Sequence, residues 1–322
     1  MAITITQVQA ITNDLVIEGM KESVFNSAAL FRHLYEKREK KSGGNTIGAA
    51  VVIDGQLDAT TGEWYAGASA LVGSEKSDIT RAVVNWKQAH ETIVLSKLDI
   101  MKNNGVAQIL ALMTEKVDIA KNRFKARLSA GVHSDGTTIP LAFGGIKQFV
   151  TATGDYAGLA IGDIKDSSGA NAWLAYVGGT TGALTEAKMQ LCKGKATQDL
   201  EAPTAAFMNQ NVYNEVWGLL QSHQRIVAED SSFSGAGHDQ KKVLIYNGIP
   251  HYIDSYTEAA ALVYLNTDFT KLYVHAMEDM VSQNFDKLED SNAVKNRMLI
   301  TGNVLCSKRN RNSKLTGITV VA

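Results

Sequence analysis

Two strand-like segments, TIGAAVVI (46–53) and ITRAVVNWKQAHETIVL (79–95), precede the helix-like segment VAQILALMTEKVDIAKNRFKARL (106–128). Apolar residues alternate with their neighbours in the first segment, and the second is rich in Val, Thr and Ile, so both predict strands. In the third, apolar residues recur at steps of three and four, which predicts an amphipathic helix. We expect a long two-stranded ribbon followed by a long core helix that stops at Gly131.

The end of this ribbon carries aromatic residues without a local core. Trp64 and Tyr65 lie among the Gly, Ala and Thr residues of 60–70. A two-stranded hairpin is only marginally stable alone in water, so another surface usually covers it. A neighbouring copy of the chain could supply that surface, with Glu63, Trp64 and Tyr65 as candidate interface residues. The alternative is that these are ordinary exposed aromatics without a role.

Residues 1–45 precede the ribbon and contain a helix-like segment, Ser23–Lys41, before the Gly43-Gly44 turn. A run of charged residues closes this segment. Such runs usually form a solvated face, and the alternative is contact with acidic surfaces of other copies or with nucleic acid. The basic residues available for such contacts are Arg32, Lys37, Arg38, Lys40 and Lys41.

The rest of the chain mixes short strands with helices, and it predicts an α+β fold. Thr185 and Glu186 open one helix, and Asn209 or Asn211 caps a second. With three Pro and no linker, the domains must interleave along the chain. The expected later strands are 204–208, 242–246, 252–254, 262–266, 271–275, 297–306 and 315–321, with the basic turn 307–314 between the last two.

Composition excludes several classes of protein. The 32 Lys and Arg residues nearly balance the 33 Asp and Glu residues, so no global positive field favours nucleic-acid binding. The N-terminal residues carry no secretion signal, and no apolar run is long enough to span a membrane, so we expect a soluble protein made in the cytoplasm. Cys192 and Cys306 form no metal-ligand pattern and are expected to be buried.

Patterns that would indicate enzymatic chemistry are incomplete. The lysines around Gly194 hint at a phosphate loop, but Met189 stands where glycine is needed. His90-Glu91 begins like a zinc-protease motif, but Val94 replaces the second histidine. The pair of glycines around Ala236 lacks the third glycine of a dinucleotide site. We therefore expect no catalytic residue, no metal site and no cofactor.

From about residue 45 onward, the order of these elements resembles that of the major capsid proteins of tailed bacteriophages, which have the Hong Kong ninety-seven type fold. No single motif accounts for the resemblance, which lies in the order of the elements along the chain. It comprises the hairpin and spine-like helix, Gly144-Gly145-Ile146, Gly158–Ile164, Trp173, Leu184-Thr185, Ala205–Asn209, Tyr213, Gly248-Ile249-Pro250, Asp254, Val263–Asp268 and Gly302-Asn303.

The resemblance implies a division into four parts: an N-terminal arm (1–45), an extended hairpin loop (46–95), a peripheral domain and an axial domain (201–285). The peripheral domain would comprise 96–200 and 286–322, with a spine helix over about 103–130. The hairpin would lie over a neighbouring subunit. Pentamers and hexamers would then build an icosahedral shell around double-stranded DNA, without a cofactor and without sequence-specific binding.

The resemblance also implies partners and a location. The chain has no room for the N-terminal scaffolding region of some capsid proteins, and Met1-Ala2 resembles a translational start, so we expect separate scaffolding, portal and decoration proteins. The shell would form in the host cytoplasm and become the virion capsid. Two alternatives stay open: an encapsulin-like compartment, which shares the fold and encloses enzymes, and an uncharacterised α+β enzyme.

Overall fold

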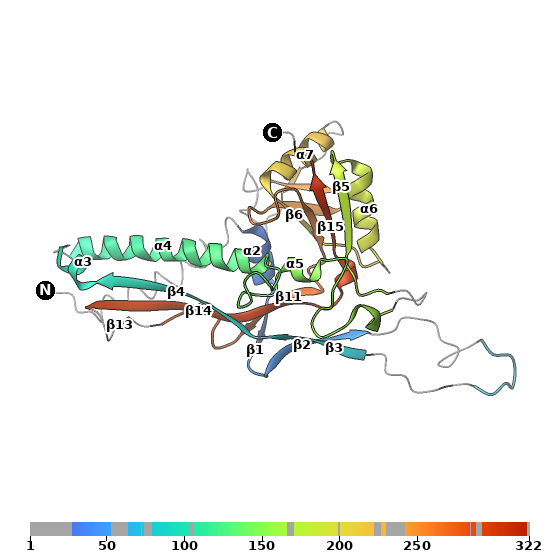
Figure 1. Ribbon diagram of the computed structural model, residues 1–322, viewed down its shortest axis with the longest axis horizontal. Coiled ribbons are helices and arrows are strands. Elements are labelled where there is room, and N and C mark those ends of the chain that lie inside the picture. Colours follow the sequence, from blue (N-terminus) through green and yellow to red (C-terminus); the bar gives the residue numbers. More distant parts are fainter. Residues whose placement is uncertain are drawn as a thin grey trace.

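The structure is a computed structural model that describes residues 28–52, 64–71, 73, 79–102, 106–165, 171–198, 200–221, 227–229, 242–283, 285–287 and 292–320. Figure 1 shows an elongated molecule. A long helix, α4, runs along an extended sheet at one end, a second sheet with two helices stands on the middle, and a two-stranded ribbon points to the opposite end. This mixed arrangement confirms the predicted α+β fold.

Helix α4 (Val106–Val132) packs on the extended sheet through the apolar stripe predicted from the sequence. The buried members of that stripe are Met113, Val117, Ala120, Phe124 and Leu128. The expected stop at Gly131 is wrong, because the helix runs through this residue to Val132. Here the glycine lies against Phe143, from which an added Cβ would be 3.8 Å away.

The extended sheet contains six described strands, with the long strand β14 (Ala293–Cys306) at its centre. β14 pairs antiparallel with β4 (Lys87–Ser96) over ten residues, and its final residues pair with β11 (Thr270–His275). The smaller members are β1 (Glu39–Lys41), β12 (Val281–Ser282) and β13 (Asp286–Lys287), and the short helix α3 (Lys97–Lys102) follows β4.

The N-terminal helix is shorter than predicted. Of the expected segment Ser23–Lys41, residues 23–27 lie outside the described part of the chain, and helix α2 spans Ala29–Glu36. The prediction is wrong beyond Glu36, because Glu39–Lys41 form β1 and pair in parallel with β11. The helix buries Leu30, Phe31 and Leu34 against the core, which fixes its orientation.

The second sheet contains seven described strands in the order β5-β15-β10-β6-β9-β8-β7. Helices α6 and α7 lie against the same core as one face of this sheet. Alternate residues of β6 serve two cores: Ala206 and Met208 pack with these helices, whereas Phe207 packs with the main core. The elements are β5 (Tyr176–Gly182), α6 (Glu186–Ala196), β6 (Ala205–Met208), α7 (Gln210–Gln221), β7 (Val227–Glu229), β8 (Lys242–Tyr246), β9 (Ile249–Ile253), β10 (Leu262–Leu265) and β15 (Ser313–Ile318).

Each sheet takes strands from both of the expected domains. β11 belongs to the expected axial segment, yet it lies in the six-stranded sheet. β5 and β15 belong to the expected peripheral segments, yet they lie in the seven-stranded sheet. The four-part division therefore stays a prediction, and the sheets show how closely its parts are interleaved.

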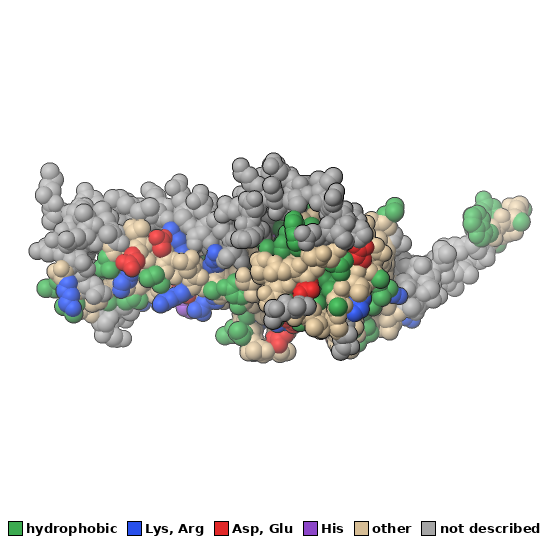
Figure 2. Space-filling model, turned by 90° about the horizontal axis from the view of Figure 1, so that it is seen from above, with side chains coloured by type: hydrophobic (Ala, Val, Ile, Leu, Met, Phe, Trp, Pro, Cys, Tyr) green, Lys and Arg blue, Asp and Glu red, His purple; other side chains and the backbone are tan. Residues whose placement is uncertain are grey.

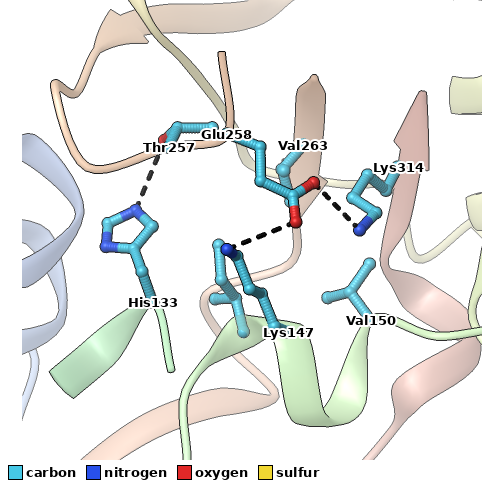
Figure 3. A pocket seen from close by; sticks show the side chains of 8 residues that line it. His133, Lys147, Val150, Thr257, Glu258, Val263 and Lys314 are labelled. Atoms are coloured by element: carbon cyan, nitrogen blue, oxygen red, sulfur yellow. Dashed lines mark hydrogen bonds and ion pairs between the residues drawn. The ribbon is translucent and has the colours of Figure 1, made fainter. Parts of the chain in front are cut away.

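The junction between the sheets is held by polar contacts around a small cavity (Figure 3). Glu258, in the loop between β9 and β10, lies 3.3 Å from Lys147 of the short helix α5 (Ile146–Phe149) and 3.2 Å from Lys314 of β15. Burial opposes ionisation of Glu258, but these two lysines outweigh it and lower the pKa of the carboxyl. Close by, His133 Nε2 at the end of α4 lies 3.3 Å from Thr257 Oγ1.

The predicted helix caps are confirmed. Thr185 Oγ1 accepts a hydrogen bond from the backbone N–H of Lys188, and Asn209 Oδ1 accepts one from the backbone N–H of Val212 at 3.0 Å. The sequence offered Asn209 or Asn211 as the N-cap of α7, and the structure shows that Asn209 is the cap. Its side-chain amide also donates to the carbonyl of Ala259.

Replacing Asn209 by alanine should lower the free energy of unfolding by about 1 kcal/mol, because the first turn of α7 loses its acceptor. Urea unfolding of the subunit measures this loss. Asn211→Ala is the matched control, since Asn211 is exposed in the same turn, and its effect should stay within about 0.5 kcal/mol. Equal losses in both variants would contradict the assignment of the cap.

Candidate assembly interface

The predicted ribbon is confirmed at its base. β2 (Thr46–Val52) pairs antiparallel with β3 (Ile79–Asn85), from Thr46 opposite Asn85 to Val52 opposite Ile79. The second strand-like segment then divides at Trp86, because its later part forms β4 and pairs with β14 instead of β2. The ribbon therefore begins directly beside the extended sheet.

Several contacts fix the base of the ribbon to the body of the molecule. Ile47, Val51 and Ala82 point into the main core and are buried. The indole N–H of Trp86 donates to the carbonyl of Gly44 at 2.8 Å. The backbone N–H of Val83 donates to the carbonyl of Ala157 at 2.8 Å. The base of the ribbon thus has a defined direction, and it lies beyond the end of the extended sheet that α4 covers (Figure 1).

The described residues of the hairpin tip, 64–71, lie at the far end of the molecule (Figures 1 and 2). Here Trp64 is 103% exposed, Tyr65 63% and Leu71 74%. Ser69 closes a turn by donating to the carbonyl of Ala66 from both its N–H and its hydroxyl. No hydrogen bond, ion pair or ring contact joins Trp64 or Tyr65 to another residue of the described ranges. Glu63, the third expected interface residue of the tip, lies outside those ranges.

The five basic residues expected in the N-terminal arm all contact groups of their own chain. Two of them, Arg38 and Lys40, lie 2.9 and 2.7 Å from Asp279. The other contacts are Arg32 with Glu36, Lys37 with Asp268 and Thr267, and Lys41 with the carbonyl of Gly48 and the ring of Tyr273.

These ion pairs stabilise the ionised form of the acid. Burial opposes ionisation of Asp279, but hydrogen bonds from Lys40, Arg38 and Tyr35 outweigh it and lower the pKa of its carboxyl. Lys37 and Lys40 keep about half of their side-chain surface exposed. A role for the basic residues at a subunit interface or toward nucleic acid stays a prediction, and the structure adds that they also anchor α2 and β1.

Known structures share this arrangement over nearly the whole chain. The chain of a cyanophage A-1(L) capsid asymmetric unit has a TM-score of 0.66 at 14% identity, with 92% of this chain and 94% of that chain covered. The capsid of a native GTA particle gives 0.61 at 13% identity, with 91% of each chain covered. An encapsulin complex from Synechococcus elongatus gives 0.53 at 8% identity, with 88% and 85% covered. No protein-family model and no curated protein matches the sequence.

The chain has the Hong Kong ninety-seven type fold. The resemblance inferred from the order of sequence elements is thereby confirmed for the fold. In the Hong Kong ninety-seven type fold of this chain, α4 is the spine helix and the β2–β3 ribbon is the base of the extended hairpin. Its exposed tip is the outermost described part of the molecule.

One buried charged residue was not apparent from the sequence. Arg309, in the basic turn between β14 and β15, is fully buried. Its Nε and Nη1 donate to the carbonyls of Phe149 and Gly154, both at 2.9 Å, and Nη2 donates to Thr151 Oγ1 at 3.1 Å. The guanidinium also lies 5.7 Å from the ring centre of Trp173. A count of basic residues could not separate the buried Arg309 and Arg311 from the half-buried Lys308 and Lys314 of the same turn.

Both cysteines are buried, as expected from the sequence. Burial raises the pKa of the Cys192 thiol to about 12, and it also raises the pKa of Cys306. His90 is exposed on β4, and His251 is buried, which lowers its pKa to about 4. Within the described ranges, no group of three His, Cys, Asp or Glu residues could hold a metal ion. No helix in those ranges is long and apolar enough to cross a membrane.

Proposed function

We propose that this chain is the major capsid protein of a tailed bacteriophage, a structural subunit that forms pentamers and hexamers and builds an icosahedral shell around double-stranded DNA. The observation that carries the proposal is the hairpin, which is fixed at its base and exposes two aromatic side chains at its far end. The fold shared with capsid chains along both full lengths supports it.

The hairpin tip of the isolated subunit leaves large apolar side chains in water. An exposed Trp and Tyr on an arm gain little within one subunit, whereas buried Trp and Tyr side chains dominate interfaces. Burial of apolar surface contributes about 25 cal/mol per Å². In a shell every subunit both gives and receives the same contact, so a modest contact is repeated many times. This repetition stabilises a closed assembly without a bound cofactor.

The proposal assigns a role to each part of the chain. Residues 96–200 and 286–322 form a peripheral domain around α4, 201–285 form an axial domain, 46–95 form the intersubunit hairpin, and 1–45 form an N-terminal arm. Scaffolding, portal and decoration proteins are separate chains. The shell assembles in the host cytoplasm, becomes the virion capsid, and catalyses no reaction.

The net charge of −1 fits a wall that encloses DNA without binding it tightly. Tight binding of DNA needs many unpaired Lys and Arg residues to neutralise phosphates. In this chain four residues of the basic run, Arg32, Lys37, Arg38 and Lys40, form ion pairs with acids of their own chain. We therefore place DNA inside the shell as enclosed material that is not recognised by sequence.

The purified chain is expected to form pentamers, hexamers or closed shells at micromolar concentration, alone or with the scaffolding protein encoded beside it. Sedimentation velocity and negative-stain microscopy measure this directly. A single monomer peak under both conditions would contradict the proposal. Particles of uniform diameter support it.

The second candidate is an encapsulin-like compartment, which the likeness to the encapsulin complex favours. The contents of native particles separate the two functions, because a capsid holds double-stranded DNA and a compartment holds protein cargo. Nuclease-resistant DNA in purified particles supports the capsid. An enzyme with this fold would instead show a melting temperature that rises with a small ligand.

A further inference from the structure

A cavity opens beside the base of the ribbon, between strand β2 and the basic turn that joins β14 to β15. It has a volume of about 790 Å³, and small-molecule sites in proteins typically measure about 300–1,000 Å³. One part of its wall is apolar and comes from Val51, Val52, Ile164 and Phe269. The size and the apolar wall are therefore those of a site for a small organic molecule.

The polar part of the wall is dominated by hydrogen-bond donors. Four of its side chains carry donors and no acceptor: Lys165, Trp173, Lys308 and Arg311. Among the described residues, no Asp or Glu lines the cavity. Lys165 is exposed at its edge, and no acid in the described part of the chain pairs with it. A ligand that complements this wall is rich in acceptors and negatively charged.

The indole of Trp173 supplies a donor that lacks a partner. Its side chain is only 1% exposed, and its Nε1 has no acceptor among the residues that the structure describes. Buried donors without an acceptor are rare in folded proteins, because their hydrogen bond to water is lost and not replaced. An unpaired donor in a residue that lines a cavity indicates that its acceptor comes from outside the chain.

The basic turn holds its cationic side chains in place without a ligand. Lys308 Nζ lies 2.6 and 2.8 Å from the carboxylate oxygens of Glu201, and Arg311 Nε lies 2.7 Å from one of them. Burial opposes ionisation of Glu201, but hydrogen bonds from these two cations outweigh it and lower the pKa of the carboxyl. One anion beside three cations, including Lys165, leaves a charge of +2 around the cavity.

We infer that this cavity binds a small organic phosphate of about the size of a nucleotide. The cations and the indole N–H supply the donors that a phosphate requires, and the apolar wall receives the carbon part of the ligand. A bare phosphate ion would leave most of a cavity of this volume empty. The site lies within one subunit, so the inference goes beyond the proposed function and does not depend on assembly.

Calorimetric titration of the purified subunit with deoxyadenosine monophosphate (dAMP) tests the inference. We expect saturable binding at one site with a Kd below about 1 mM. Lys165→Ala should weaken binding by about tenfold, because a charge-assisted hydrogen bond is lost while an exposed side chain contributes little to the fold. Lys195→Ala is the matched control, since Lys195 is exposed on α6 outside the cavity, and it should leave the affinity unchanged. Equal weakening by the two variants would overturn the inference.

The role of the indole N–H has its own test. Trp173→Phe keeps an aromatic ring and removes the donor, so it should weaken dAMP binding by about tenfold. Trp217→Phe is the control, because Trp217 is 44% exposed on α7 and does not line the cavity. Unchanged affinity in both Lys165→Ala and Trp173→Phe would overturn the inference. Lys165→Ala keeps the test decisive if Trp173→Phe lowers the yield of folded subunit.

Other phosphates identify the source of the ligand. Inorganic phosphate should bind at least about tenfold more weakly than dAMP, because it leaves the apolar wall uncovered. Binding of a short DNA duplex that depends on Lys165, without binding of dAMP, would overturn the inference. Bound dAMP should be recovered unchanged, which separates this site from that of an enzyme, and its conversion would contradict a binding site. None of these results depends on whether shells form, so the proposed function is tested separately.

Discussion

Replacing Trp64 and Tyr65 together by alanine is expected to prevent shell formation while the subunit stays nearly as stable as before. Both side chains are exposed in the isolated subunit, so their removal leaves no cavity and should change the free energy of unfolding by less than about 0.5 kcal/mol. At an interface, truncation of a buried Trp or Tyr typically costs about 2 kcal/mol or more. The same loss at every contact of a shell suffices to stop assembly.

Thermal melting of the subunit and electron microscopy of assembly reactions measure the two effects separately. Leu200→Ala is a suitable control, because Leu200 is 101% exposed, as fully as Trp64, but lies far from the hairpin in the sequence. It should change neither the melting temperature nor the yield of shells. A large loss of melting temperature with normal shells in the double variant would show that Trp64 and Tyr65 pack within their own subunit.

Replacing Arg309 by alanine is expected to lower the free energy of subunit unfolding by about 3 kcal/mol or more. The change leaves the carbonyl of the buried Phe149 without its donor and removes the hydrogen bonds to Gly154 and Thr151, and an unsatisfied buried group costs about 1–3 kcal/mol. It also opens a cavity beside Trp173. Burial lowers the pKa of the guanidinium, although an arginine in a protein stays protonated at neutral pH.

Urea unfolding of the purified subunit measures this loss. Arg309→Lys keeps the charge but not the planar set of donors, so it should recover only part of the stability. Arg297→Ala removes an exposed arginine of β14 and should cost less than about 0.5 kcal/mol. A similar small loss for Arg309→Ala would show that the buried contacts contribute little to stability.

The elements with local patterns were predicted well from sequence. The stripe of α4 repeats every three to four residues, so it can be recognised without knowledge of its partner. The cap at Asn209 and the antiparallel base of the ribbon are also local features. The expected exposure of Trp64 and Tyr65 is confirmed, whereas their role in assembly stays a prediction.

The errors come from pairing between distant parts of the chain. Glu39–Lys41 have a composition suited to a helix. They form a strand because they pair in parallel with β11 at the edge of the extended sheet. The sequence also could not show that the segment changes its pairing partner from β2 to β14 at Trp86. An alternating pattern predicts a strand, but it does not say which strand lies beside it. Gly131 lies within the helix against Phe143, and the carbonyl partners of the buried Arg309 come from a loop more than a hundred positions earlier, so the local sequence shows neither neighbour.

The order in which the ribosome makes this chain delays the completion of both sheets. β14 is the partner of β4, β11, β12 and β13, and β15 lies between β5 and β10, so neither sheet is complete until residues 293–318 have been made. At about 5–20 residues per second, roughly 10 to 40 seconds separate synthesis of the hairpin from that of β14. During this interval β4 lacks its partner β14. Both sheets therefore close only when almost the whole chain has been made, so folding of the subunit is completed at the end of synthesis and not domain by domain.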